Sequence, residues 1–275
     1  MCGTCGCGEG DGVTITDEHG VHTHVLRDGT VVTHSHGDDG HGHAQHGGHA
    51  QHGGHAHDEQ HGVEVLEARI LEKNDRLAER NRAWLAGRKV LAVNLMSSPG
   101  AGKTRLLERT LREIDGDVVV LEGDQETEND AARIRATGAP VLQINTGTGC
   151  HLEADMVWHG LARLDPPFGA TLFIENVGNL VCPALFDLGE DARVVLFSVT
   201  EGEDKPLKYP HMFRGADLVL LTKVDLLPHL DFDRAAALQA LQEVSPDATV
   251  LEVSSRTGDG LEAWYGWLRE RRATR

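Results

Sequence analysis

The stretch "SSPGAGKT", residues 97–104, restricts the fold of this chain more than any other feature. It follows the apolar run "VLAVNLM" and precedes "RLLERTLREI", whose apolar residues recur at helical spacing. Between a strand and a helix, the glycines of such a loop let backbone N–H groups turn inward around phosphates, and the helix N-terminus adds partial positive charge. The sequence therefore predicts an α/β fold that binds a nucleotide.

Apolar runs alternate with amphipathic segments through the rest of the chain, after a helix predicted over 63–86. Strands are predicted near 89–96, 117–122, 140–145, 171–176, 193–199, 217–222 and 248–253, and helices near 103–115, 128–137, 152–164, 231–243 and 260–272. This alternation is typical of a mostly parallel sheet covered by helices on both faces. The fold class is thus a P-loop NTPase, and we expect residues 63–275 to form the GTPase domain.

Residues 1–62 have a different composition. They hold thirteen of the seventeen histidines, few large apolar side chains, and nine Asp or Glu against one Arg. Such a segment cannot bury a core, so the sequence predicts a disordered Cys/His-rich tail that binds metal. Only the alternation around "RDGT", residues 27–30, favours local structure there, as a β-hairpin.

The net charge of −17 argues against nucleic acid or an anionic membrane as the main partner, since both would repel the chain. No apolar run is long enough to insert into a membrane, and the first residues lack the pattern of a signal peptide. We therefore expect a cytoplasmic protein. In that reducing compartment, its five cysteines are expected to be thiols or metal ligands.

The phosphate loop and three carboxylates form the predicted reaction site. The loop residues expected to contact the nucleotide are Ser98, Pro99, Gly100, Ala101, Gly102, Lys103 and Thr104, with Ser97 where the motif has its first glycine. Lys103 reaches the terminal phosphates, and Thr104 offers its hydroxyl to Mg²⁺. Asp124, Asp130 and Glu175 follow strands on the phosphate side, where they are expected to help hold the Mg²⁺. Lys103, Asp130 and Glu175 are the predicted catalytic residues.

Taken alone, each of these acidic residues is more often a helix cap or a solvated charge than a metal ligand. Their joint position at strand ends favours the site. The segment between Asp124 and Asp130 enters a helix and is the expected switch region.

The run "TKVD" follows a buried strand and predicts which base is bound. Asp225 can accept hydrogen bonds from guanine N1 and its exocyclic amine, which adenine lacks, while the stem of Lys223 covers the base. Ser254 and Ser255 in "VSSRTG" are expected to close the pocket. Thr222 stands where guanine-binding proteins usually have Asn. The sequence therefore favours GTP over ATP.

The tail carries two kinds of predicted metal site. Cys2, Cys5 and Cys7 beside the terminal amine form a compact set of three thiolates and one nitrogen, which suits square-planar Ni²⁺, with Zn²⁺ as the competing ion. Imidazoles that are neutral near pH 7 provide weaker, overlapping sites for nickel storage. The predicted store comprises His34, His36, His41, His43, His46, His49, His52, His55, His57 and His61.

Long motifs extend these predictions to a family. "CGTCGC", "SSPGAGKT", "TGTGCHLEADM", "FIENVGNLVCPALFDLG", "TEGEDKPLKYP" and "TKVDLLP" resemble the HypB-type hydrogenase nickel-incorporation GTPases. The resemblance implies slow GTP hydrolysis coupled to nickel delivery into the large-subunit precursor of a [NiFe]-hydrogenase, a GTP-dependent homodimer and a nickel-binding HypA-type accessory protein. It also implies a second metal site at Cys150, His151 and Cys182, shared across the dimer. Whether Asp155 and His159 supplement that site stays open.

Three alternatives remain. A metal-storage protein with a vestigial GTPase is disfavoured by intact Lys103, Thr104 and Asp225. A urease-type nickel-loading GTPase shares the architecture but fits "CGTCGC" and "FIENVGNLVCP" less well. A signalling or translation GTPase would have no use for the tail.

Overall fold

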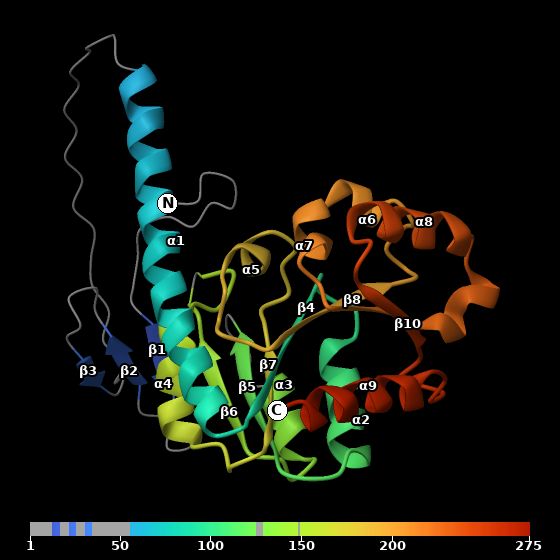
Figure 1. The fold of residues 1–275 in the computed structure, drawn as a ribbon, viewed down its shortest axis with the longest axis horizontal. Helices are drawn as coiled ribbons and strands as arrows, with labels where there is room; N and C mark the ends of the chain where they lie inside the picture. Colours follow the sequence, from blue (N-terminus) through green and yellow to red (C-terminus); the bar gives the residue numbers. More distant parts are fainter. Residues whose placement is uncertain (1–12, 17–21, 26–30, 35–55, 125–128, 148) are drawn as a thin grey trace, which may run out of the picture.

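A computed structural model describes residues 13–16, 22–25, 31–34, 56–124, 129–147 and 149–275, with side chains from residue 68 onward. Its centre is a parallel sheet (Figure 1). The sheet contains, in spatial order, β10 (Thr249–Val253), β9 (Leu218–Thr222), β8 (Ala192–Ser198), β4 (Leu91–Ser97), β7 (Thr171–Glu175), β5 (Val118–Asp124) and β6 (Val141–Asn145). Each neighbouring pair is parallel, which confirms the predicted fold class.

The predicted helices are also present, with ends that differ by less than one turn. They are α2 (Lys103–Glu113), α3 (Asn129–Arg135), α4 (Ala154–Leu164), α8 (Arg234–Val244) and α9 (Leu261–Ala273). Four short helices have no counterpart in the sequence prediction: α5 (Cys182–Leu185), α6 (Lys205–Lys208), α7 (Pro210–Arg214) and the 3₁₀ helix η1 (Val224–His229). Elements this short contain too few residues for an apolar period to be detected.

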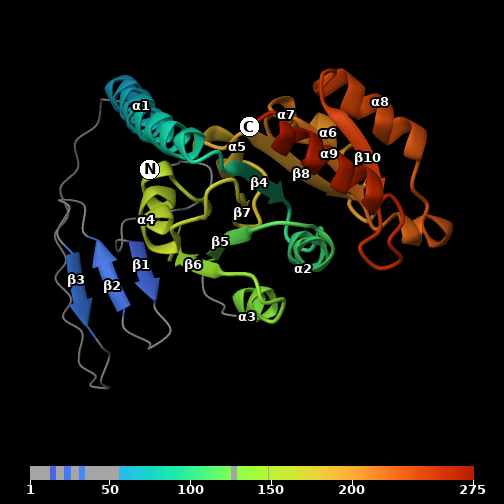
Figure 2. The same ribbon diagram turned by 60° about the horizontal axis from the view of Figure 1, so that its bottom comes forward.

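The central strand β4 is buried on both faces, as parallel strands require. Leu91, Val93 and Leu95 pack with α2, α3 and α9, whereas Ala92 lies in a cluster with α4 and the long helix α1 (Ala56–Gly87). Met96 packs with α7 and α8 on that second face. Figure 2 shows α3 and α4 on opposite sides of β5 and β6. The carboxyl ends of the strands therefore meet at one edge, between two layers of helices.

Three short strands extend the sheet beyond β6: β1 (Val13–Thr16), β2 (His22–Val25) and β3 (Val31–His34). The hairpin predicted around residues 27–30 is confirmed, since β2 and β3 pair antiparallel with Val25 opposite Val31. β1 pairs antiparallel with β6, Thr14 opposite Asn145. These strands lie within the segment predicted as a disordered tail. Their alternating, β-branched residues can complete the exposed edge of β6.

Most predicted tail ligands lie outside the described residues, namely Cys2, Cys5, Cys7, His36, His41, His43, His46, His49, His52 and His55. Of the predicted nickel store, His34 ends β3, and His57 and His61 belong to the first turns of the long helix α1 (Ala56–Gly87).

Helix α1 begins at Ala56, whereas the sequence predicted a start at residue 63. The buried side of α1 is not simply its apolar side, because Ile70 is 38% exposed. Asn74, Ala78, Asn81 and Leu85 point inward instead. Two of these are asparagines, whose amides bind backbone groups of neighbouring segments. None of the helices in the described part of the chain is long and apolar enough to cross a membrane.

Candidate nucleotide and metal sites

The phosphate loop joins β4 directly to α2. Gly100 and Gly102 have φ values of 76° and 100°, in the left-handed region that glycine adopts without steric cost. Gly102 is the residue that precedes the first turn of α2. The sequence therefore needs glycine at both positions to turn the loop over the helix N-terminus, where backbone N–H groups can bind phosphate.

Lys103 is held at the base of this loop. Its buried amine donates a 3.0 Å hydrogen bond to Ser97 Oγ. Burial lowers the pKa of Lys103, and the charges of Glu175 and Asp130 oppose this change. Ser97, which replaces the usual first glycine, is itself buried and donates to the Ser98 carbonyl at 2.6 Å. The serine thus adds a side-chain anchor for the lysine.

A cavity of about 340 Å³ opens above the loop. Thr104 Oγ1 donates to Glu175 Oε1 at 2.7 Å, and Asp124 and Asp130 also line the cavity. The predicted loop residues that line it are Pro99, Gly100, Gly102, Lys103 and Thr104. Ser98 and Ala101 lie behind the lining, where Ser98 Oγ donates to Glu201 at 2.6 Å and accepts from Lys205 at 2.8 Å. Residues 125–128 of the expected switch are outside the described residues.

A fourth carboxylate, Glu122, was missed by sequence reasoning. It is 2% exposed and lies opposite Glu175 in the β5–β7 register. Burial, followed by the charge of Glu175, raises the pKa of Glu122 to about 8. Burial also raises the pKa of Glu175. The sequence contains one signal for Glu122, its spacing of two residues from Asp124, since alternate residues of a strand face the same side.

The carboxylates suit a magnesium ion. Within the described residues, Glu122 Oε2 and Glu175 Oε2 are buried and have no hydrogen-bond partner. Both glutamates line the same cavity as Thr104, and Mg²⁺ binds oxygen ligands. Thr104, Asp124, Asp130 and Glu175 all present side-chain oxygens to this cavity, and their role as magnesium ligands stays a prediction.

Two arginines at the cavity were not predicted. Arg105 and Arg133 both line it. Arg133 donates to Asp130 at 3.1 Å and to Glu108 at 2.5 Å. Arg133 acquires its position only because α3 packs beside α2, which a linear pattern does not reveal.

The predicted base-binding residues gather beside the phosphate loop. Thr222 Oγ1 donates to the Ala101 carbonyl at 2.8 Å, and Lys223 Nζ donates to the Gly100 carbonyl at 2.7 Å. Asp225 Oδ1 accepts from Ser254 Oγ at 2.6 Å. The neighbouring Ser255 offers its carbonyl to Arg109 at 3.3 Å. The ends of β9 and β10 therefore place Lys223, Asp225, Ser254 and Ser255 in one region, as expected.

Cys150, His151 and Cys182 form a cluster whose potential ligand atoms all lie within 4.8 Å of one another. Burial lowers the pKa of His151 to about 4, so its ring is neutral near pH 7. His151 Nε2 is buried and forms no hydrogen bond to any described residue. Two sulfurs and one imidazole are donors that both Ni²⁺ and Zn²⁺ accept, and His151 Nδ1 lies 3.6 Å from Cys150 Sγ.

Asp155 and His159 do not join the cluster found among the described residues. They lie on α4, where His159 Nδ1 is 2.8 Å from the Asp155 carbonyl, and the His159 side chain is 46% exposed. Phe186, which sequence reasoning missed, stacks on the ring of His151 with centroids 4.0 Å apart.

The metal cluster and the cavity share the carboxyl edge of the sheet. Cys150 follows β6, and Cys182 begins α5 after β7. Between Glu175 and Cys182, Gly178 packs so closely on the phosphate loop that a Cβ there would lie 3.2 Å from Pro99 Cα. The segment carrying Cys182 thus contacts the phosphate loop directly.

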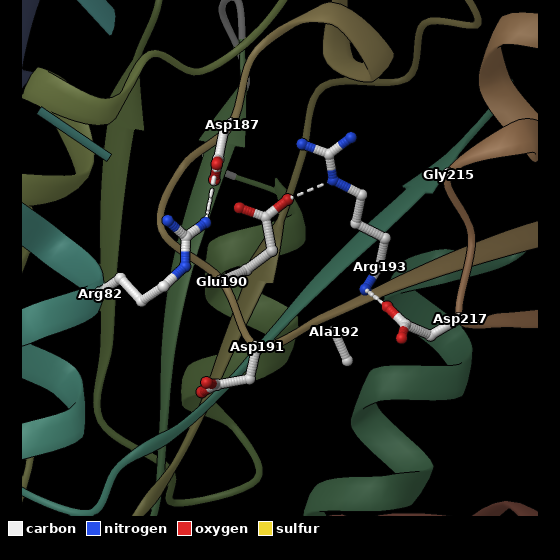
Figure 3. A pocket seen from close by; sticks show the side chains of 8 residues that line it. All are labelled: Arg82, Asp187, Glu190, Asp191, Ala192, Arg193, Gly215 and Asp217. Atoms are coloured by element: carbon white, nitrogen blue, oxygen red, sulfur yellow. Dashed lines mark hydrogen bonds and ion pairs between the residues drawn. The ribbon is translucent and has the colours of Figure 1, made fainter. Parts of the chain in front are cut away.

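A second cavity, of about 260 Å³, contains a set of ion pairs (Figure 3). Its lining residues are Arg82, Asp187, Glu190, Asp191, Ala192, Arg193, Gly215 and Asp217. Arg82 pairs with Asp187, and Arg193 with Glu190. Asp191 pairs with Arg275, and Asp217 with Arg271. Each charged side chain that lines this cavity therefore already forms an ion pair within the protein, so the cavity offers no unpaired charge to a ligand.

The glycine-rich loop on a parallel sheet and the aspartate beside it define a P-loop nucleotide-binding protein with a GTPase-type fold. Residues 91–252 match the family described as CobW/HypB/UreG, nucleotide-binding domain. Within it, the chain belongs to the HypB hydrogenase maturation factors.

Relatives and solved structures carry this assignment. HypB of Escherichia coli (strain K12) is 48% identical over 291 residues, covering 99% of both chains. HypB of Azotobacter vinelandii is 58% identical over 212 residues, covering 76% of this chain and 70% of that protein. The crystal structure of HypB from Archaeoglobus fulgidus superposes with a TM-score of 0.69 at 41% identity, covering 74% of this chain and 100% of that one. HypB from Helicobacter pylori in complex with nickel has the same TM-score at 38% identity, covering 74% and 96%.

Proposed function

We propose that this chain hydrolyses GTP and uses it to deliver nickel into the large-subunit precursor of a [NiFe]-hydrogenase. The observation that carries the proposal is the shared sheet edge, where the Cys150–His151–Cys182 cluster and the phosphate loop are joined by the segment 175–182. The nickel complex of the Helicobacter pylori relative supports nickel as the cargo.

Hydrolysis rests on charge stabilisation. Lys103 and the N–H groups of the loop stabilise negative charge that develops on the transferred phosphoryl group. Thr104, Asp124, Asp130 and Glu175 would hold Mg²⁺, which neutralises charge between the terminal phosphates. Asp130 and Glu175 lie on the cavity, where they would orient the attacking water. Asp225, Lys223, Ser254 and Ser255 would select guanine, so GTP is the nucleotide.

Nickel handling rests on three groups of ligands. The proposed tight site is Cys2, Cys5 and Cys7, and the histidine store supplies weaker sites. Cys150, His151 and Cys182 form the domain site, with Zn²⁺ as a competitor, and GTP would bring two copies together so that their cysteines share one ion. A HypA-type accessory protein and the hydrogenase precursor are the proposed partners. Thiolate ligands need a reducing compartment, so we place the protein in the cytoplasm.

The test removes the phosphate contact. Lys103→Ala is expected to abolish GTP hydrolysis, measured as phosphate release, while equilibrium dialysis still detects the parent amount of bound nickel. Arg269→Ala removes an exposed cation on α9 and serves as the control. Hydrolysis at the parent rate in Lys103→Ala would show that this loop is not the reaction site.

A urease-type role is the second candidate. A relative from Helicobacter pylori, 40% identical over 215 residues, is described as a hydrogenase/urease maturation factor. Nickel transfer from the loaded protein to hydrogenase precursor and to apo-urease, measured side by side, separates the two roles.

A further inference from the structure

A network of buried side chains connects the two proposed sites. Asn176 directly follows Glu175 and is 1% exposed. Its Oδ1 accepts from the backbone N–H of Leu152 at 3.2 Å, and also from Val177 at 3.0 Å. Leu152 is the residue after His151. A single side chain thus joins the strand that carries the magnesium ligand Glu175 to the loop that carries the metal cluster.

The network continues through the sheet. Asn176 Nδ2 donates to Asn94 Oδ1 at 3.4 Å, and Asn94 Nδ2 donates to Glu190 Oε1 at 3.2 Å. Glu190 Oε2 accepts from the backbone N–H of Leu188 at 2.7 Å. Asn94 belongs to β4, and Figure 3 shows Glu190 between the Arg82–Asp187 and Arg193 side chains.

Helix α1 closes the network into a ring. Asn81 Nδ2 donates to the Leu188 carbonyl at 3.0 Å and to the Ala154 carbonyl at 2.7 Å. Asn74 binds the same two segments, because its Oδ1 accepts from the Ala154 N–H at 2.9 Å and its Nδ2 donates to the Asp187 carbonyl at 2.7 Å. Residues 152–154 and 187–188 are therefore connected both through α1 and through Asn176.

The ring encloses the residues that set the position of His151. Leu152 and Ala154 follow His151, and the segment 187–188 follows Phe186. The ring centroids of Phe186 and His151 are 4.0 Å apart. Asn81 and Asn94 are 0% exposed and Glu190 is 7% exposed. Buried polar groups are costly when unpaired, so each bond in the ring resists independent displacement of its neighbours.

We propose that Asn176 is the positioning residue that transmits the state of the nucleotide site to the Cys150–His151–Cys182 cluster, with Asn81, Asn94 and Glu190 as its fixed frame. A displacement of Glu175 on binding of GTP and Mg²⁺ moves Asn176 with it. The bond to Leu152 N–H then shifts His151 relative to the two thiols. The inference rests on the proposed function, because it assumes that these residues bind metal and that nucleotide changes this binding.

The test uses Co²⁺ as the probe, in the full chain with Cys2, Cys5 and Cys7 changed to Ser. Sulfur-to-cobalt charge-transfer absorption then reports only thiolates of the domain cluster, since imidazoles give no such band. Cobalt affinity is measured with GDP and with a non-hydrolysable GTP analogue. In this background we expect the analogue to change the affinity by a factor of roughly 5–150, the usual range of coupling between sites.

Asn176→Ala is expected to reduce that factor to below about two while the dissociation constant of the analogue changes little. Asn176→Asp keeps an acceptor for Leu152 N–H and is expected to keep most of the coupling. Thr110→Val is the matched control, because it removes a buried 3.0 Å hydrogen bond to Trp264 on the other face of the sheet. Should Asn176→Ala not fold, Asn176→Ser tests the same bond.

Coupling at the parent value in Asn176→Ala would overturn the inference and leave the proposed function intact. Equal loss in Asn176→Asp and Asn176→Ala would show that the acceptor for Leu152 N–H does not carry the coupling, and would also overturn the inference. No nucleotide effect on cobalt affinity in the Ser background itself would contradict the coupling in the proposed function, and the inference with it.

Discussion

At the scale of single residues, contiguous motifs indicated side chains that line the cavity at the phosphate loop, such as Lys103 and Thr104. Roles could be predicted for Lys103, Thr104 and Asp225 because each belongs to a short motif, "SSPGAGKT" or "TKVD". The role of Glu122 was not predicted, because its spacing from Asp124 indicates only a shared face of the strand and not Glu175, its partner across the sheet. The four buried asparagines of the network, Asn74, Asn81, Asn94 and Asn176, were missed for the same reason, because their hydrogen-bond partners are distant in sequence.

Glu122 should make stability depend on pH. Its folded pKa of about 8 lies above the ordinary value of 4.5, so the folded state keeps a proton that the unfolded state loses. In protein free of nucleotide and Mg²⁺, this contribution is complete below pH 4.5 and is lost as pH rises to about 8. As pH rises through that window, the free energy of unfolding of Glu122→Gln should therefore increase relative to that of the parent, by about 1 kcal/mol per pH unit. Denaturant titrations at several pH values measure it.

Glu243→Gln, an exposed change on α8, is the control for Glu122→Gln. The raised pKa of Glu122 would be contradicted if the free energies of unfolding of Glu122→Gln and the parent differed by a constant amount from pH 5 to 8.

Asp225 should determine the base. Asp225→Asn replaces an acceptor by a donor at the guanine edge, so GTP affinity should fall by about tenfold or more, while affinity for xanthosine triphosphate rises. Titration with fluorescent analogues of both nucleotides measures this. Unchanged GTP affinity would remove Asp225 from the pocket.

At the scale of elements, periodicity predicted the central strands and long helices, because each buries a regular apolar face. It placed the start of α1 too late and did not indicate the stripe of this helix that is buried. That stripe contains Asn74 and Asn81, whose burial is explained only by the backbone groups they bind. Helix α1 is thus positioned by polar contacts and by a close approach to Gly189, where a Cβ would lie 2.5 Å from the Ala78 carbonyl oxygen.

Gly189→Ala should therefore displace α1. The residue has a φ of 86°, and the added methyl group would also overlap the helix backbone. We expect a loss of about 2–3 kcal/mol in the free energy of unfolding. Gly138→Ala is the matched control, with a φ of 88° and nothing within 4 Å of the added Cβ, so it should cost only about 1 kcal/mol. Equal losses in the two variants would show that the packing of α1 on Gly189 contributes nothing.

At the scale of the whole molecule, the architecture brings nucleotide and metal residues to one edge, and this follows from parallel topology. The sequence could predict this edge because the end of each apolar run marks the carboxyl end of a strand. It could not predict that β1 and its hairpin would extend the sheet, since pairing with β6 is a long-range contact.

The tail should divide into separable nickel sites. Deleting residues 35–55 leaves β3 and α1 intact and should sharply lower the number of bound Ni²⁺ ions, while a tight thiolate site remains. Replacing Cys2, Cys5 and Cys7 by Ala should then remove that site. Equilibrium dialysis against Ni²⁺ measures both steps. Loss of the tight site with the deletion alone would contradict the assignment to the cysteines.

Coupling between GTP and metal across a dimer is the central claim of this account. Analytical ultracentrifugation measures the dimer dissociation constant and so tests this coupling. The parent and Cys150→Ala are each measured with a GTP analogue, with nickel, with both and with neither. In the parent, the two ligands together should strengthen dimerisation by more than the sum of their separate effects, by about 1–3 kcal/mol. Cys150→Ala should respond to the analogue but show no such excess. Strictly additive effects in the parent would contradict the account.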